Sequence, residues 1–206
     1  MAFERLPPTA PPQVSPYGDD WDLLWIGHCA QTFPADDKPA VARGRVIQAN
    51  DSTVPARHHL ESPFIQPFML ADEYPDHTRA VHHSRWGACT SAYAVSQRGA
   101  RKIVLQLGLK EAVAPVDLLL RAFCDSDAGR GENQCLTTQP SLVNHHRPVG
   151  PIAEDSDIRD AGTGFRHVGE TKMIRLSARL NAEALIWGGT DLKDRYPDAV
   201  DGAKLP

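Results

Sequence analysis

The sequence predicts an α/β fold in which a mixed sheet is flanked by helices. Three segments support this prediction: an apolar strand over residues 23–29, a strand followed directly by a helix over 88–108, and another helix over about 115–124. A short strand that is apolar throughout is typical of a sheet covered on both faces. Because only about three strands are evident, we expect fewer strands than a complete doubly wound sheet contains.

The N-terminal part contains one well-defined element. Residues 1–16 hold five prolines and no periodic pattern, which predicts a disordered lead-in. A turn at Tyr17-Gly18-Asp19-Asp20-Trp21-Asp22 then leads into the strand at 23–29. Residues 30–80 are rich in Pro, Asp and His, with short strands or loop anchors expected at 41–47 and 64–70. An irregular stretch of this length predicts a functional loop region or an undetected element.

The segment from 88 to 124 gives the most specific local predictions. Residues 89–96 are β-prone and largely apolar, as in a buried strand. Ser96 is placed to cap the start of the following helix and Gly108 to end it. Pro115 suits the first position of the next helix, so Asp117 falls in that helix's first turn. The apolar face of the first helix consists of Ala100, Ile103, Val104 and Leu107.

The C-terminal part predicts a strand over 135–143 and a helix over 172–187 that Gly188-Gly189 stops. We therefore expect one domain over 17–190, between the lead-in 1–16 and a polar tail 191–206. The helix is predicted from an apolar stripe formed by Met173, Leu176, Leu180, Ala184 and Trp187.

Charge and hydropathy exclude two classes of partner. The net charge of the 206-residue chain is -4 and no Lys/Arg cluster stands out, which argues against a nucleic-acid partner. No run approaches the ~20 apolar residues that span a bilayer. Residues 1–14 are Pro-rich and lack the apolar segment of a signal peptide, so the residues alone leave the localisation unknown.

The four cysteines leave two readings open. They form no C-x-x-C pair, which argues against a zinc ribbon or a redox motif. Cys124 and Cys135 flank a polar loop that a disulfide can close, and a disulfide implies an oxidising compartment. The glycosylation sequon Asn50-Asp51-Ser52 points to the same compartment. Four buried thiols are the equally weighted alternative.

Several blocks resemble glycosyltransferase family 25. Residues 92–96 read Ala-Tyr-Ala-Val-Ser and are followed by Gly99-Ala100, whereas the second half of a family 25 domain has Ala-Tyr-Ala-Leu-Ser followed by Gly-Ala. Three further blocks are similar to the fungal branch of the family, and the resemblance covers roughly residues 15–200. These blocks lie at 17–29, at 139–148, and at the closing helix with Asp191 and Tyr196-Pro197-Asp198.

The resemblance implies a GT-A-like mixed sheet and transfer of a sugar from a nucleotide-sugar donor to a hydroxyl of a glycan or protein acceptor. It also implies a divalent metal (Mn²⁺ or Mg²⁺) that neutralises the donor diphosphate, and a location in the Golgi or ER lumen. Family members have an N-terminal half with an acidic run of the Leu-Glu-Asp-Asp type, which this sequence does not contain. We therefore expect an incomplete, acceptor-side part of such a domain. A catalytically inactive, truncated remnant that acts as a binding module is the alternative.

Asp117 is the candidate catalytic residue, because a carboxylate can deprotonate an acceptor hydroxyl. Its alternative role is to stabilise a helix N-terminus through the helix dipole. A metal hydrolase built on the histidine pairs is disfavoured, since no H-E-x-x-H spacing occurs.

The candidate donor- or acceptor-binding residues each have a structural alternative. Tyr93 could stack on a sugar or belong to the core, and Ser96 could contact ligand or cap its helix. Asp20 and Asp22 spell D-x-D, but a solvated turn is the favoured reading. Of the four tryptophans, any of which could form a sugar platform, Trp25 and Trp187 better fit the core. The other two are Trp21 and Trp86.

His145 and His146 are the candidate metal ligands. Adjacent residues of a strand point to opposite faces, so we expect at most one of them at a given site. The same holds for the pairs His58-His59 and His82-His83, and exposed side chains are the default expectation for all three pairs.

Overall fold

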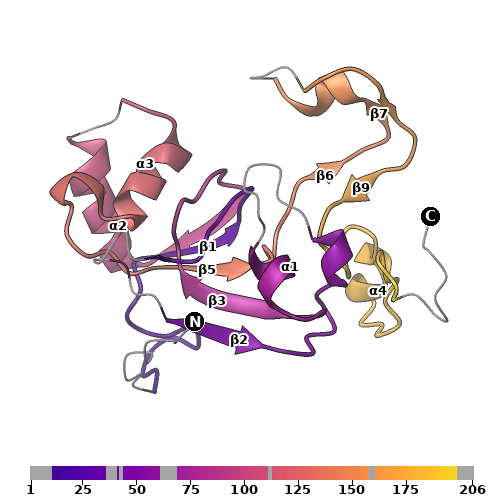
Figure 1. Ribbon diagram of the computed structural model, residues 1–206, viewed down its shortest axis with the longest axis horizontal. Helices are drawn as coiled ribbons and strands as arrows, with labels where there is room; N and C mark the ends of the chain where they lie inside the picture. The colour runs from indigo at the N-terminus through magenta and orange to yellow at the C-terminus, as the bar shows by residue number, and fades with distance from the viewer. Residues whose placement is uncertain are drawn as a thin grey trace.

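The computed structural model of the chain describes residues 11–35, 41, 44–60, 69–110, 113–157 and 161–198. Its centre is a five-stranded mixed sheet in the order β2-β3-β5-β1-β4 (Figure 1). The two central strands β1 (Leu23–Gly27) and β5 (Cys135–Gln139) run parallel. The outer strands β2 (Arg45–Gln48), β3 (Arg79–His83) and β4 (Ala92–Val95) are antiparallel to their neighbours. The mixed α/β class predicted from the sequence is confirmed.

One face of this sheet carries the core. The strand register places Trp25, Thr137 and His82 in one row across β1, β5 and β3, and all three are buried. Side chains at intervening positions point to the opposite face, where Val46 and Val81 are exposed. β1 is fully buried on this face and partly buried on the opposite face, at Leu24 and Ile26, so it is less completely covered than predicted.

Helices cover one end of the buried face. α2 (Gln97–Ile103) continues into a π-helical turn, η2 (Val104–Gly108), and α3 (Val116–Cys124) lies beside them in Figure 1. The start and end predicted for the first helix are confirmed, since Oγ of Ser96 accepts a hydrogen bond from the Gly99 amide (3.0 Å) and the helical turns end at Gly108. The apolar core at this end consists of Leu23, Trp25, Leu107, Leu120, Phe123, Cys124 and Cys135.

A second core cluster lies over β2 and β3. It includes Phe33, Val54 and Leu70, with α1 (Met69–Glu73) and the short 3-10 turn η1 (Arg57–His59) beside it. The part of the expected strand at 64–70 that covers 64–68 lies outside the described residues, and Met69 and Leu70 begin α1.

Short elements complete the chain between α3 and the C-terminal part. Figure 1 shows the chain at β6, β9 and β7 leading away from the five-stranded sheet, whereas α4 (Ala182–Ile186) lies below β9 on the same side. No helix in the described ranges is long and apolar enough to cross a bilayer. The remaining elements are η3 (Asp127–Gly129), η4 (Ile152–Asp155), the pair β6 (His146–Arg147) with β9 (Glu170–Thr171), and the pair β7 (Gly150–Pro151) with β8 (Phe165–Arg166).

Strand β3 was not predicted and begins at the end of the irregular stretch 30–80, which also contains the unpredicted η1 and α1. Its buried positions are Ala80 and His82, whereas Val81 points to the exposed face. The apolar-in, polar-out alternation that identifies a half-buried strand is thus partly reversed. The expectation that the paired histidines are exposed is wrong for His82, whose exposed fraction is 2%.

The helix predicted over 172–187 is wrong. Only residues 182–186 are helical, Met173 has a φ of 59°, and Trp187 is 83% exposed instead of buried. Side-chain contacts explain the difference. The amide of buried Asn181 bonds the backbone of Ser177 and Lys193, and Arg175 pairs with carboxylates of the following segment, so tertiary contacts override the periodic pattern.

The strand predicted over 135–143 is shorter than expected, because β5 ends at Gln139. The chain then turns so that the amides of Leu142 and Val143 both donate to the Ile26 carbonyl. Pro115 lies one residue before the first residue of α3, and Asp117 is in its first turn as predicted.

All four cysteines form disulfides, so the alternative of four buried thiols is wrong. The bond between Cys124 and Cys135, one of the two readings left open by the sequence, joins the end of α3 to the start of β5. A second bond, between Cys29 and Cys89, was not predicted and joins segments separated by 60 residues. Both bonds are consistent with folding in an oxidising compartment.

Candidate functional site

The parallel pair β1 and β5 separates the predicted site residues into two groups. Asp22 and Gln134 lie just before these strands, at their amino ends, whereas Cys29 and Pro140 lie beyond their carboxyl ends. Ligands of open α/β sheets bind outside the carboxyl ends of the strands. The position of each predicted residue relative to these two ends therefore bears on its function.

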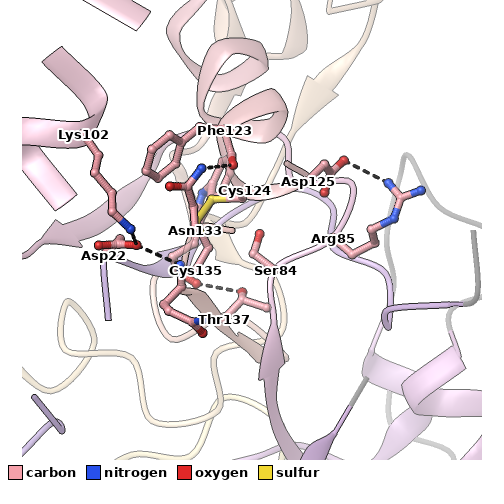
Figure 2. The surroundings of a disulfide bond; sticks show 12 residues. Asp22, Ser84, Arg85, Lys102, Phe123, Cys124, Asp125, Asn133, Cys135 and Thr137 are labelled. Carbon is pink, nitrogen blue, oxygen red and sulfur yellow. Dashed lines mark hydrogen bonds and ion pairs between the residues drawn. A yellow bond between two sulfur atoms is a disulfide. The ribbon is translucent and has the colours of Figure 1, made fainter. Parts of the chain in front are cut away.

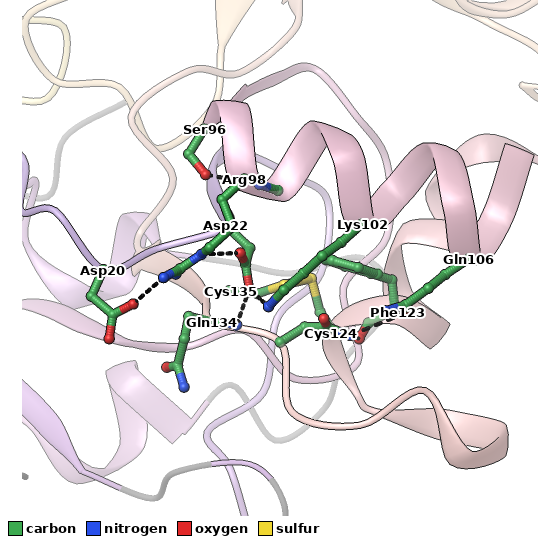
Figure 3. A network of polar contacts seen from close by, with 12 residues as sticks. Asp20, Asp22, Ser96, Arg98, Lys102, Gln106, Phe123, Cys124, Gln134 and Cys135 are labelled. Atoms are coloured by element: carbon green, nitrogen blue, oxygen red, sulfur yellow. Dashed lines mark hydrogen bonds and ion pairs between the residues drawn. A yellow bond between two sulfur atoms is a disulfide. The ribbon is translucent and has the colours of Figure 1, made fainter.

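Asp22 lies at the amino end and is fully buried (Figure 3). Its carboxylate accepts hydrogen bonds from Lys102 Nζ (2.6 Å), Arg98 Nε (2.8 Å) and the Gln134 amide (2.9 Å). Burial acts to raise the pKa of the Asp22 carboxyl, but these bonds outweigh burial and hold the pKa below its ordinary value. The prediction that Asp22 is a solvated turn residue is wrong: it ties β1, α2 and β5 together.

Asp20 is held by the same arginine as Asp22. Its carboxylate is 81% exposed and pairs with the other side of the Arg98 guanidinium, so Arg98 lies between the two acids. Ser96 caps α2 at this same end, which is the structural alternative considered for it. The amino end is therefore a structural junction.

A second buried ion pair lies on the other side of the disulfide between Cys124 and Cys135 (Figure 2). Arg85 and Asp125 are 2.9 Å apart, with side-chain exposures of 5% and 4%. Burial raises the pKa of the Asp125 carboxyl, and the nearby charge of Arg85 offsets only part of this effect. This pair is where residues 84–91, the connection between β3 and β4, begin to contact α3.

The connection 84–91 lies along α3 and contacts it at successive turns. Asp125 accepts a hydrogen bond from the Trp86 amide (3.2 Å), the Arg121 guanidinium lies 4.9 Å from the Trp86 ring, and Asp117 accepts from the Cys89 amide (3.1 Å). Asp117, Arg121 and Asp125, the residue that directly follows α3, are spaced four apart, so they lie along one face of that helix. This face of α3 packs against the connection 84–91.

Asp117 therefore lies toward the carboxyl end of β1, beside the disulfide between Cys29 and Cys89. Its two oxygens accept hydrogen bonds from the backbone amides of Cys89 (3.1 Å) and Leu118 (3.0 Å). The side chain is half-buried, and each carboxylate oxygen keeps a further lone pair. The geometry is compatible with both predicted roles of Asp117, helix stabilisation and proton acceptance.

His145 and His146 point to different partners. Nε2 of His145 is 2.9 Å from the Ser91 hydroxyl, near the start of β4, whereas Nδ1 of His146 is 3.0 Å from the Thr171 hydroxyl on β9. The expectation that they do not share one site agrees with these contacts. No group of three His, Cys, Asp or Glu side chains suited to a metal ion occurs in the described ranges. Tyr93 lies on β4 with 44% of its surface exposed.

A pocket of about 200 Å³ opens beside His146. Its polar lining includes two hydroxyls and two guanidinium groups in addition to the imidazole, and no carboxylate lines it. The lining residues are His146, Gly169, Thr171, Ser177, Arg179, Leu180 and Arg195.

No acid among the described residues neutralises the two arginines that line this pocket. Arg166 pairs with Asp155 and Glu170, and Arg175 pairs with Asp194 and Asp198. By contrast, Arg179 and Arg195 form no ion pair with any acid in the described ranges. A concave site with uncompensated guanidinium groups and hydroxyl donors suits an anion.

This environment changes the pKa of the His146 imidazole. Burial lowers the pKa of His146, and the charges of Arg179, Arg195 and Arg166 lower it further. A bound anion would reverse the electrostatic part of this effect. His146 can therefore accept a proton when an anion enters the pocket.

Sequence reasoning identified His146 but missed Arg179 and Arg195. The predicted helix over 172–187 assigned Arg179 to a solvent-facing position, and Arg195 fell in the predicted polar tail. The described part of that tail contacts the rest of the chain, since Asn181 bonds Lys193 and the Arg195 amide donates to Arg175. No short motif marks these arginines.

Comparisons with family models, curated proteins and solved structures found no match to this chain. The resemblance to glycosyltransferase family 25 therefore stays a prediction.

Proposed function

We propose that this chain takes part in the transfer of a sugar from a nucleotide-sugar donor to a hydroxyl acceptor, within a GT-A-like fold. The observation that supports this best is the pocket beside His146, whose unneutralised Arg179 and Arg195 suit the phosphate groups of such a donor. Thr171 and Ser177 add hydroxyl donors to the same pocket. The ordered sequence blocks similar to family 25 are consistent with this proposal.

The proposed reaction uses Asp117 as the proton acceptor. The acceptor hydroxyl gives its proton to the Asp117 carboxylate, its oxygen forms a bond to the anomeric carbon, and the bond from that carbon to the diphosphate breaks. The diphosphate leaves with the bonding electron pair. Asp117 does not line the pocket, so the proposal requires a donor that extends from the pocket arginines to this carboxylate. Positive charge at the pocket then stabilises the charge that develops on the leaving group.

A divalent metal remains part of the prediction from the resemblance. Among the described residues, however, the D-x-D acids do not fit a metal site, because Asp22 is bonded to Arg98 and Lys102 and Asp20 to Arg98. His145 and His146 contact Ser91 and Thr171 separately. We therefore assign neutralisation of the donor phosphates to the two arginines and derive no step that uses a metal.

Calorimetric titration with uridine diphosphate, with and without Mn²⁺, tests the donor part of the proposal. Arg179→Gln and Arg195→Gln should each weaken binding about tenfold, as expected for the loss of one charge-assisted contact. Arg101→Gln is the matched control, since Arg101 is exposed on α2 and does not line the pocket. Equal affinities in all four proteins would remove the pocket from donor binding.

Turnover of a nucleotide-sugar donor tests the catalytic part. Asp117→Asn keeps an oxygen that can accept from the Cys89 amide but cannot take up a proton at neutral pH. We expect at least a hundredfold loss of transfer with unchanged diphosphate affinity. Equal turnover in wild type and variant would exclude Asp117 from the mechanism.

The binding-module alternative has a specific observation in its favour. Both oxygens of Asp117 already accept backbone amides, as a purely structural residue would. This alternative predicts no transfer by wild type with any donor, even where diphosphate binds. Detectable transfer that depends on Asp117 would exclude it.

A further inference from the structure

We propose that Trp86, Arg121 and Asp117 form a binding site for one pyranose ring, with the Trp86 indole as its platform. The identity of this sugar as the acceptor rests on the proposed function, in which Asp117 takes up the proton. The site lies where the connection 84–91 contacts α3.

The Trp86 side chain is exposed at the surface. The residue is 52% exposed and has a φ of 57°, a left-handed conformation that bulky residues rarely adopt. Such outliers persist only where the surroundings enforce them, and they cluster at ligand-binding and active sites. An exposed indole held in a disfavoured backbone conformation is therefore a candidate for direct contact with a ligand.

Contacts of the residues before and after Trp86 in the chain fix this backbone conformation. On one side, Arg85 is held by its buried ion pair with Asp125. On the other side, a Cβ on Gly87 would lie 2.5 Å from the ring of Trp25, so this part of the backbone is pressed against the core. Cys89 then anchors the connection through its disulfide to Cys29.

Further bonds hold the same segment. The Trp86 amide donates to Asp125, and Nε1 of Trp25 donates to the Cys89 carbonyl (2.8 Å). The backbone of the connection thus cannot rotate the indole into the core without breaking several contacts. A rigid aromatic side chain loses little conformational entropy when it binds a ligand.

The groups beside the indole match the chemistry of a sugar. The Arg121 guanidinium lies over the ring, 4.9 Å from its centroid, and donates no hydrogen bond and forms no ion pair within the described ranges. Arg85 also lies over this ring, at 6.0 Å, so a sugar stacks on the part of the indole that stays exposed. Asp117 lies one helical turn before Arg121 on the same face of α3. A pyranose has an apolar C–H face that stacks on an aromatic ring, and hydroxyls at its rim that accept from arginine and donate to a carboxylate.

A protein partner would also contact an exposed tryptophan, and the experiment distinguishes the two. The probes are methyl glycosides of the common hexoses, added at millimolar concentration without nucleotide. Binding is measured by saturation-transfer NMR on the glycoside, and the site is located from shifts of the tryptophan indole N–H resonances. Trp86→Phe assigns the Trp86 resonance, and Trp187→Phe assigns that of the 83% exposed Trp187.

We expect at least one glycoside to shift the Trp86 resonance and leave that of Trp187 unchanged. Trp86→Ala should reduce saturation transfer at least tenfold, Arg121→Gln about threefold to tenfold, and the control Trp187→Ala not at all. If Trp86→Ala does not fold, the indole shifts of the wild-type protein decide the question alone. Absence of binding by the whole panel, or equal binding by wild type and folded Trp86→Ala, would overturn the proposal.

Failure of this proposal and failure of the donor-binding proposal can be told apart. Glycoside binding depends on Trp86 and is measured without nucleotide, whereas uridine diphosphate binding depends on Arg179 and Arg195. Glycoside binding without diphosphate binding would leave a sugar-binding site and remove the proposed donor pocket. Diphosphate binding without glycoside binding would do the reverse.

Discussion

Gly99 packs directly against the backbone of Asp22. A Cβ placed on Gly99 would lie 2.0 Å from the Asp22 carbonyl oxygen, a separation that only the absence of a side chain allows. That carbonyl also accepts a hydrogen bond from the Ser96 amide (3.1 Å), immediately before α2. The close approach brings Arg98 and Lys102 to the Asp22 carboxylate, so one glycine positions the helix on the sheet.

Gly99→Ala should therefore destabilise the protein by about 3 kcal/mol or more, because the clash is with backbone and cannot be relieved by a rotamer change. Chemical denaturation measures this. Gly108→Ala is the matched control: it lies at the end of the same helical segment, with no atom within 4 Å of the added Cβ. Its stability should be unchanged or raised by up to about 1 kcal/mol. Similar losses in both variants would contradict the packing argument.

Asp22→Asn should lower the free energy of unfolding by about 2 kcal/mol. The substitution removes the charge that Lys102 and Arg98 bond, although both cations can turn partly toward water. Asp20→Asn, at an 81% exposed side chain, should change stability by less than about 0.5 kcal/mol. Urea denaturation of the two variants checks this difference. Equal effects would mean that the burial of Asp22 does not matter.

The two disulfides should differ in their contribution to stability. Replacing Cys29 and Cys89 by serine opens a loop with a sequence separation of 60, whereas replacing Cys124 and Cys135 opens one with a separation of 11. Loop-closure entropy predicts losses of about 4 and about 3 kcal/mol, respectively. Denaturation under non-reducing conditions measures both. A larger loss at the shorter loop would show that local packing, rather than chain entropy, dominates.

The sequence predicted the parts of the fold that local physics determines. The cap at Ser96, the end at Gly108 and the first turn of α3 at Asp117 follow from backbone hydrogen bonding and glycine conformation, which act within a few residues. The sequence also suggested the disulfide between Cys124 and Cys135, because the two cysteines are only 11 residues apart.

Features that depend on distant contacts were missed or mispredicted. His82 is buried through neighbours such as Gln139, which contacts its imidazole, and nothing in its own segment signals this. Trp187 falls on an apolar stripe but is exposed, because Asn181 bonds Lys193 and redirects the chain. The pocket arginines were missed for the same reason: Arg195 becomes a lining residue only after this segment folds back.

The proposed anion pocket should bind more tightly as the pH falls below neutrality. The pKa of free His146 is lowered by burial and by Arg179, Arg195 and Arg166, so its imidazole is neutral near pH 7. A bound anion favours the protonated form, and binding therefore takes up a proton. Sulfate is the suitable probe because its charge is constant over pH 5–8. His146→Gln should flatten the pH dependence, and an unchanged profile would separate His146 from the anion.

Two other histidines should make the fold sensitive to acid. Burial lowers the pKa of His28 to about 4 and that of His82 to about 3. Both are neutral in the folded protein at pH 4.5, whereas in the unfolded chain they become protonated below about 6.5. The unfolded state then binds more protons, so stability falls as the pH drops from 6.5 toward 4, by about 2–3 kcal/mol for each histidine. Urea denaturation at pH 7.5, 6.5, 5.5 and 4.5 measures this slope.

His28→Gln identifies the source of the slope. Nε2 of His28 lies 2.8 Å from the Thr138 carbonyl, and a glutamine amide can donate to that oxygen without titrating. The variant should lose the contribution of His28 to the decrease, whereas His82 and the other histidines with lowered pKa values, His59 and His83, keep theirs. Carboxylates with lowered pKa values, such as Asp22 and Asp51, lose their stabilising contribution only at lower pH, below about 3.8. The two effects therefore occupy different pH windows, and an identical slope in His28→Gln would assign the acid sensitivity to groups other than His28.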